Sequence, residues 1–145
     1  MTRPARPGRD AFATFRPIQT RWADNDVYRH VNNVVYYGYF DTAVNGWLIE
    51  KDLLVPGESP VYGIVVETGC TFFESVAFPQ ALEAGIAVAR LGETSVTYAI
   101  GIFRAGGALA CAAGRFTHVY VDGATQRPTR IPEPVRAALE GLAVP

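Results

Sequence analysis

The sequence predicts an α+β fold in which a five-stranded antiparallel sheet wraps around one long helix. Helical periodicity is confined to a single long segment, residues 34–51. One strand-like segment precedes it at 14–22, and four long segments with β-branched or alternating residues follow it. An order of one strand, one helix and then four strands is typical of a sheet that buries one face against a helix.

The N-terminal part of the chain divides into a lead and a first strand. Residues 1–13 are rich in Arg, Pro and Gly and show little periodicity. We therefore expect a flexible lead there, followed by a single domain over residues 14–145. Within 14–22, Ile18, Thr20 and Trp22 alternate with Gln19 and Arg21, which is typical of a half-buried strand.

The long helix is expected over residues 34–51. Its large apolar residues recur at intervals of four, three and four positions and therefore share one face. These residues are Tyr36, Phe40, Ala43 and Trp47. A β-branched start and two glycines make the segment a poor helix former, so we expect packing against the sheet to hold it together.

Four further strands are expected after the helix, and turn-like dipeptides such as Gly92-Glu93 and Gly106-Gly107 separate two of the pairs. They cover residues 61–74, 80–91, 94–104 and 108–121. We expect these four to pair in order, as an antiparallel meander. Large residues alternate with small ones in 94–104, so one face should pack against the helix and the other should meet something that needs little room. A short helix with proline at its start is expected at 134–140.

Composition and charge narrow the classes of function. A length of 145 residues suits one domain, and 49% hydrophobic with 19% charged residues describes a folded protein with a large core. The balance of 13 basic and 14 acidic residues argues against a nucleic-acid partner. No apolar run is long enough to span a bilayer, so we expect a cytoplasmic protein with no membrane partner. Cys70 and Cys111 are expected to be buried thiols, and His30 and His118 suggest no metal site.

The segment 21–33 is where we expect the chemistry. It places two carboxylates, Asp24 and Asp26, together with His30 and two asparagines immediately ahead of the helix. Amide N–H groups at a helix start lack intrahelical partners and lie at the positive end of the helix dipole, so they can hold an oxygen that gains negative charge. A neighbouring carboxylate can act as base or nucleophile toward a carbonyl group.

This segment resembles the hotdog-fold acyl-CoA thioesterases of the 4-hydroxybenzoyl-CoA thioesterase type, whose pattern reads D-x-D-x-x-x-H-V-N-N-x-x-Y-x-x-Y-F. The positions that match are Asp24, Asp26, His30, Val31, Asn32, Asn33, Tyr36, Tyr39 and Phe40. The resemblance implies a hotdog fold and an enzyme that hydrolyses acyl-CoA to the free acid and coenzyme A without a cofactor. It also implies a homodimer, or a homotetramer built as a dimer of dimers.

The resemblance also implies roles for single residues. Asp26 corresponds to the catalytic carboxylate, as base or nucleophile, and His30 and Asn33 complete the expected catalytic set. The turn from Arg90 to Ser95 resembles an R-L-G-x-x-S turn that meets coenzyme A, although Glu93 stands where a basic residue is common. The expected substrate-binding residues are Asn32, Val34, Tyr36, Arg90, Gly92, Thr94, Ser95, Arg127 and Arg130, with the last two facing phosphates.

Structural and functional alternatives stay open for this motif. Asp26 and the asparagines could simply cap the helix or its turn, and His30 could fix the loop rather than act on a proton. A hotdog hydratase or dehydratase is one rival, but its D-x-N-P-x-H pattern is missing, because Asp26 precedes His30 by four residues without an intervening proline. A non-catalytic acyl-CoA-binding protein is another rival, although residues 1–13 are too short for a DNA-binding segment.

Overall fold

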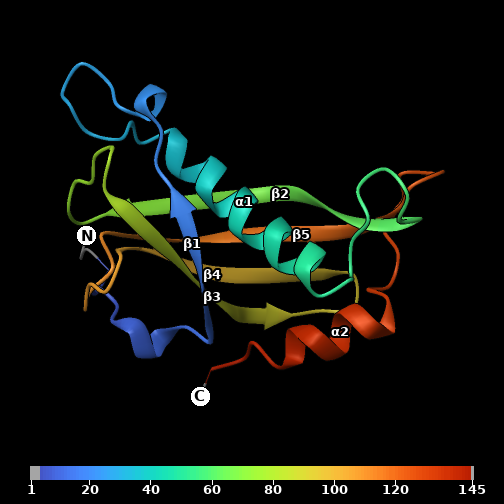
Figure 1. Cartoon of the computed structure of the whole chain (residues 1–145). Coiled ribbons are helices and arrows are strands. Elements are labelled where there is room, and N and C mark those ends of the chain that lie inside the picture. The colour runs from blue at the N-terminus through green and yellow to red at the C-terminus, as the bar shows by residue number, and fades with distance from the viewer. Residues whose placement is uncertain (1–3, 145) are drawn as a thin grey trace.

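The computed structural model describes residues 4–144 and contains the expected elements in the expected order. The strands are β1 (Thr14–Gln19), β2 (Val61–Phe72), β3 (Ala81–Leu91), β4 (Ser95–Arg104) and β5 (Ala112–Asp122), and the α-helices are α1 (Val35–Glu50) and α2 (Glu133–Glu140). Two short 3₁₀ helices, η1 (Arg9–Ala11) and η2 (Trp22–Asp24), flank β1. The first strand is therefore shorter than the predicted 14–22, and the prediction is wrong for Trp22, which lies in η2 and is 81% exposed. Helix α1 lies across one face of the sheet, and α2 lies beside the β3–β4 end (Figure 1).

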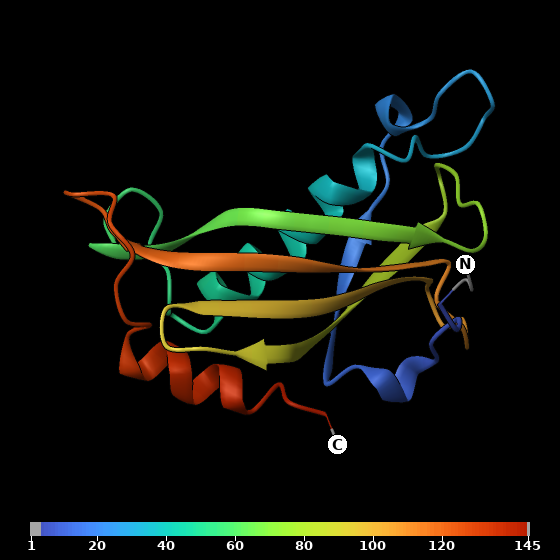
Figure 2. The same ribbon diagram turned by 180° about the vertical axis from the view of Figure 1, so that it is seen from behind.

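The five strands form one antiparallel sheet in the order β1-β3-β4-β5-β2, seen from behind in Figure 2. This confirms the predicted α+β architecture of a five-stranded sheet around a helix. The prediction that the last four strands form a meander is wrong for β2. Only β3, β4 and β5 pair in sequence order, because β1 occupies the free side of β3 and β2 pairs with β5 instead. Strand β2 therefore becomes an edge of the sheet, and it exposes Ile64, Val65 and Val66.

The core forms between α1 and the sheet. The predicted apolar face of the helix is buried, with Phe40, Ala43 and Trp47 packed in the same cluster as Tyr98 and Ile100 of β4. Burying each large side chain of this kind stabilises the fold by roughly 1.5–3 kcal/mol. This packing explains why a segment with two glycines stays helical.

The opposite face of the sheet is covered by the N-terminal segment. Phe12 is buried there with Phe103, and its ring occupies the space that side chains at two glycines would need. A Cβ atom at Gly85 would lie 2.8 Å from the Phe12 ring, and one at Gly101 would lie 2.6 Å from it. The small residues predicted on this face of β4 thus accommodate an aromatic ring. Residues 1–3 of the expected lead lie outside the described residues.

Within residues 4–144, no helix is long and apolar enough to cross a membrane. Cys70 and Cys111 are free thiols, half-buried and buried respectively.

Candidate active site

The segment between β1 and α1 is anchored by a buried carboxylate, Asp24, which is 1% exposed. Its Oδ2 accepts hydrogen bonds from the Arg21 backbone N–H at 2.9 Å and from the Tyr39 hydroxyl at 2.7 Å. Its Oδ1 accepts from the Arg21 guanidinium at 3.0 Å. Because Tyr39 lies on α1, Asp24 ties the beginning of the loop to the helix that follows it.

The ionised form of Asp24 is favoured despite its burial. Burial by itself raises the pKa of this carboxyl, but the hydrogen bonds from Tyr39 and Arg21 outweigh it, so that the net pKa lies below the ordinary value of 3.8. A carboxylate with both oxygens occupied is poorly placed to accept a proton from water. Asp24 is therefore a structural residue of the loop.

Asp26 lies in a tight loop with one carboxylate oxygen unoccupied. The Asp26 N–H donates to the His30 carbonyl at 3.0 Å, and the Arg29 N–H donates to the Asp26 carbonyl at 3.0 Å. Arg29 has a φ of 65°, in the left-handed region that costs an ordinary residue about 1 kcal/mol. Asp26 Oδ1 accepts the Tyr28 N–H at 2.9 Å, while Oδ2 accepts no hydrogen bond from residues 4–144. The backbone bonds thus hold a half-buried carboxylate with one oxygen available.

The start of α1 leaves one amide available as well. The Val34 N–H donates to Asn32 Oδ1 at 3.0 Å, and the Val35 N–H donates to the Asn32 carbonyl at 2.9 Å. The Tyr36 N–H donates to the Asn33 carbonyl at 3.3 Å. Asn32 therefore closes the turn that leads into the helix, and the Val34 amide is already occupied. In the part of the chain that the structure describes, the Asn33 N–H has no acceptor.

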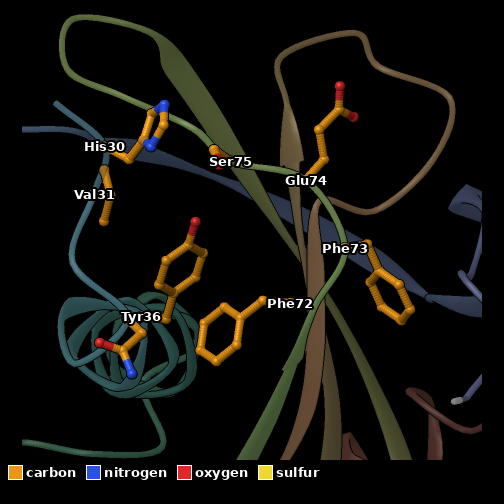
Figure 3. Close-up of a pocket in the computed structure, with 8 residues that line it drawn as sticks. His30, Val31, Tyr36, Phe72, Phe73, Glu74 and Ser75 are labelled. Carbon is orange, nitrogen blue, oxygen red and sulfur yellow. The ribbon is translucent and has the colours of Figure 1, made fainter. Parts of the chain in front are cut away.

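A cavity of about 280 Å³ lies between the start of α1 and the end of β2 (Figure 3). Its lining residues come from the loop and helix and from the segment that follows β2: His30, Val31, Asn33, Tyr36, Phe72, Phe73, Glu74 and Ser75. The Tyr36 hydroxyl points toward the space between His30 and Ser75, whereas Phe73 and Glu74 point away from Tyr36 (Figure 3). The structure thus brings together three predicted site residues, His30, Asn33 and Tyr36.

Asp26 borders a different cavity, of about 410 Å³, together with Trp22, Asn25, Arg29 and Phe78. The rings of Trp22 and Phe78 meet edge to face, 6.1 Å between centroids. Asn25 Oδ1 accepts the Phe78 N–H at 3.0 Å and so joins this loop to the segment after β2. Asp26 and Asn33 are therefore connected through the same loop but line separate cavities within one chain.

Two arginines that the sequence analysis did not single out for this site fix the segment after β2. Glu74 pairs with Arg6 at 2.5 Å and with Arg104 at 3.1 Å, and Arg104 also donates to the Ser75 carbonyl at 2.7 Å. The hydrogen bond from Arg6, followed by that from Arg104, lowers the pKa of the Glu74 carboxyl. No local sequence signal marks Ser75 or these arginines, because the contacts join segments about 30 to 70 residues apart.

The predicted coenzyme A residues lie far from this cavity. The turn from Arg90 to Ser95 joins β3 to β4 at the end of the sheet opposite the loop that carries Asp26 (Figures 1 and 2). In this turn the Gly92 N–H donates to the Ser95 carbonyl at 2.8 Å, and the Gly92 carbonyl accepts from Arg136. Arg127 and Arg130 are exposed in the segment after β5. Val34 is exposed beside another cavity, between β1 and α1.

The sequence matches the model of one protein family over most of its length. The model of the thioesterase-like superfamily matches residues 20–139. The chain belongs to this superfamily. The matched span contains the Asp24–Asn33 loop, the helix and every strand after it. No curated protein sequence matches the chain.

Solved structures show the same fold for this thioesterase-like protein. The PA5185 protein from Pseudomonas aeruginosa strain PAO1 is 51% identical, covering 97% of this chain and 98% of that one with a TM-score of 0.94. The TT1821 protein from Thermus thermophilus is 29% identical, covering 88% and 98% with a TM-score of 0.76. A 1,4-dihydroxy-2-naphthoyl-CoA thioesterase from Synechocystis is 17% identical, covering 86% and 93% with a TM-score of 0.78, a likeness of fold alone.

Proposed function

We propose that this protein is an acyl-CoA thioesterase in which Asp26 activates water. One observation carries the proposal: a carboxylate with an available oxygen is held in the loop directly before a helix whose Asn33 N–H is also available. Superfamily membership supports thioester chemistry, and the coenzyme A part of the substrate is our inference from the motif.

In the proposed reaction, Asp26 takes a proton from a water molecule as the water oxygen bonds to the thioester carbonyl carbon. The carbonyl π electrons move to oxygen, and the Asn33 N–H at the positive end of α1 stabilises that oxyanion. The reaction therefore requires the substrate carbonyl to lie between the Asp26 cavity and the Asn33 cavity, which are separate within one chain. When the carbonyl reforms, the carbon–sulfur bond breaks and the coenzyme A thiolate leaves. The proton held by Asp26 goes to the thiolate, so that one water and one acyl-CoA become one acid and one coenzyme A. His30 lines the same cavity as Asn33.

A substrate bound in the cavity of Figure 3 can reach the predicted coenzyme A residues only on a second subunit. Arg127 and Arg130 follow β5, and the Ile131 N–H donates to the Glu93 carbonyl at 2.9 Å, so the two predicted coenzyme A segments lie together. They adjoin the beginning of β2, because Val61 pairs with Asp122. If two β2 edges pair antiparallel, the beginning of one β2 lies beside the end of the other, where the cavity of Figure 3 opens. We therefore propose a homodimer, or a dimer of dimers, that shares its sites.

The test is a thiol-release assay with purified protein and acetyl, medium-chain, long-chain and aromatic acyl-CoAs. Asp26→Asn should lower kcat at least ~100-fold on the preferred substrate while the protein stays folded. Asp52→Asn, at an exposed acid after the far end of α1, is the matched control and should keep full activity. Absence of thiol release from every acyl-CoA by the folded protein would contradict the function. Full activity in Asp26→Asn would contradict the role of that residue alone.

A further inference from the structure

Tyr36 is a buried tyrosine whose hydroxyl faces the cavity beside the free amide. It lies three residues after Asn33, so the two share one face at the start of α1, and helical side chains lean toward the N-terminal end. Its side chain is 3% exposed, and both residues line the cavity of about 280 Å³. Figure 3 shows the hydroxyl directed into the space between His30 and Ser75.

The hydroxyl oxygen of Tyr36 lies near a backbone amide that favours its ionised form, which leaves its proton to point elsewhere. This amide is the Val76 backbone N–H. The Val76 carbonyl in turn accepts the Val31 N–H at 2.8 Å, so one residue of the segment after β2 fixes both the loop and the tyrosine. No acceptor for the Tyr36 proton is found in residues 4–144. A hydroxyl carries one donor, and here that donor is unengaged at a buried site.

The ring of Tyr36 is held in place by its neighbours. Phe72 packs against it edge to face with 5.0 Å between centroids, and Tyr39 packs against it at 5.9 Å. Burial, with a further contribution from the nearby Cys111 and Cys70 thiols, raises the pKa of Tyr36 to about 12. The phenol therefore stays protonated at neutral pH and remains a hydrogen-bond donor.

The other two tyrosines of α1 do not share this arrangement. The Tyr39 hydroxyl donates its proton to Asp24 at 2.7 Å. The Tyr37 ring packs against Phe40 at 6.1 Å between centroids. Neither residue lines the cavity of Figure 3. The feature that distinguishes Tyr36 is thus a free donor that faces a cavity also lined by Asn33, whose amide has no acceptor in residues 4–144.

We propose that Tyr36 is a catalytic residue that donates a hydrogen bond, together with the Asn33 N–H, to the thioester carbonyl oxygen as it becomes an oxyanion. The inference rests on the proposed function and adds a second donor to it. Tyr36 keeps its proton throughout; the proton taken from water still goes to Asp26 and then to the thiolate. Because the oxyanion exists only on the way to products, the bond is strongest in the transition state and raises kcat rather than substrate affinity.

The experiment compares Tyr36→Phe with Tyr37→Phe as a matched control on the same helix. Removing one oxyanion donor commonly costs about 10²–10³ in kcat, and we expect this loss in Tyr36→Phe with KM changed less than about threefold. Its affinity for a trifluoromethyl ketone analogue of the preferred acyl-CoA should fall by the same factor as kcat. The control should match the wild type in kcat, KM and analogue affinity.

Different outcomes separate the two proposals. If the wild type releases thiol and Tyr36→Phe keeps its kcat within about threefold, the role of Tyr36 is wrong and the proposed function stands. A rise in KM with unchanged kcat also contradicts the catalytic role of Tyr36, since that result shows only that Tyr36 contacts the bound substrate. If Tyr36→Phe unfolds, 3,5-difluorotyrosine incorporated at position 36 decides: a shift of the alkaline limb of the kcat profile to lower pH supports the role, and an unshifted limb overturns it. If the wild type releases no thiol, the proposed function itself fails.

Discussion

Replacing Asp24 by Asn should lower the free energy of unfolding by about 2 kcal/mol at pH 7. The variant keeps the shape of the side chain and one acceptor oxygen. The Tyr39 hydroxyl and the Arg21 N–H, which now donate to a charged oxygen at 2.7 and 2.9 Å, would donate to a neutral one. Hydrogen bonds to charged groups contribute about 1.5–3 kcal/mol and neutral ones about 0.5–1.5, so each bond loses about 1 kcal/mol.

The other interactions of Asp24 change this figure little. The Arg21 side chain is 72% exposed, so its ion pair with Asp24 contributes only about 0–1 kcal/mol. Against this loss, a neutral amide is easier to bury than a carboxylate. Tyr39→Phe, which removes one donor and leaves the carboxylate buried, should cost a similar amount. Because the two residues share one hydrogen bond, the costs of the two changes should not add in the double variant.

The cost of Asp24→Asn should depend on pH in a defined direction. The folded-state pKa of Asp24 lies below its ordinary value of 3.8. A carboxyl of this kind contributes stability that is fully present above the unfolded-state pKa and is lost as the pH falls through the folded-state pKa. The difference between wild type and Asp24→Asn should therefore be constant from pH 7 to pH 5 and should shrink below about pH 3.8.

Urea unfolding at one protein concentration measures these differences, since the stability of an oligomer depends on concentration. Asp26→Asn is the matched control, because the Asp26 carboxylate accepts one hydrogen bond near the surface and should cost less than about 0.5 kcal/mol. Asp24→Asn should also lower kcat per folded molecule less than Asp26→Asn does. A larger stability loss in Asp26→Asn than in Asp24→Asn would refute the division between a structural and a catalytic aspartate.

Two further predictions concern the interior and the assembly. Burial lowers the pKa of His118 to about 4 in the folded state, below its value of about 6.5 in the unfolded state. The free energy of unfolding should therefore fall as the pH drops from 6.5 toward 4, because the unfolded chain then binds a proton that the folded protein does not. Urea unfolding should show a loss of about 2 kcal/mol between pH 7 and pH 5 in the wild type but not in His118→Leu; equal losses in both would contradict this. Light scattering in dilute buffer should give at least twice the mass of one chain, and a monomer with full specific activity would rule out both the oligomer and the shared site.

The different roles of the two aspartates do not follow from the sequence. Asp24 and Asp26 stand two residues apart in one motif, and nothing in their spacing separates their surroundings. The structure separates them, because the Tyr39 hydroxyl from α1 reaches Asp24 and no described donor reaches Oδ2 of Asp26. Tyr36 and Tyr39 of the helix differ in the same way, since only the fold decides which of them meets Asp24 and which meets Val76.

The sequence by itself determined the order of elements and the apolar face of α1. Both depend on periodicity within a few residues, which a linear pattern records. Tertiary structure alone decided that β2 pairs with β5, that Phe12 fills the space above Gly101, and that Ser75 and Glu74 border the cavity. These contacts join segments about 40 or more residues apart. Their free energy depends on which surfaces the other strands leave uncovered. A local sequence pattern therefore cannot predict these contacts.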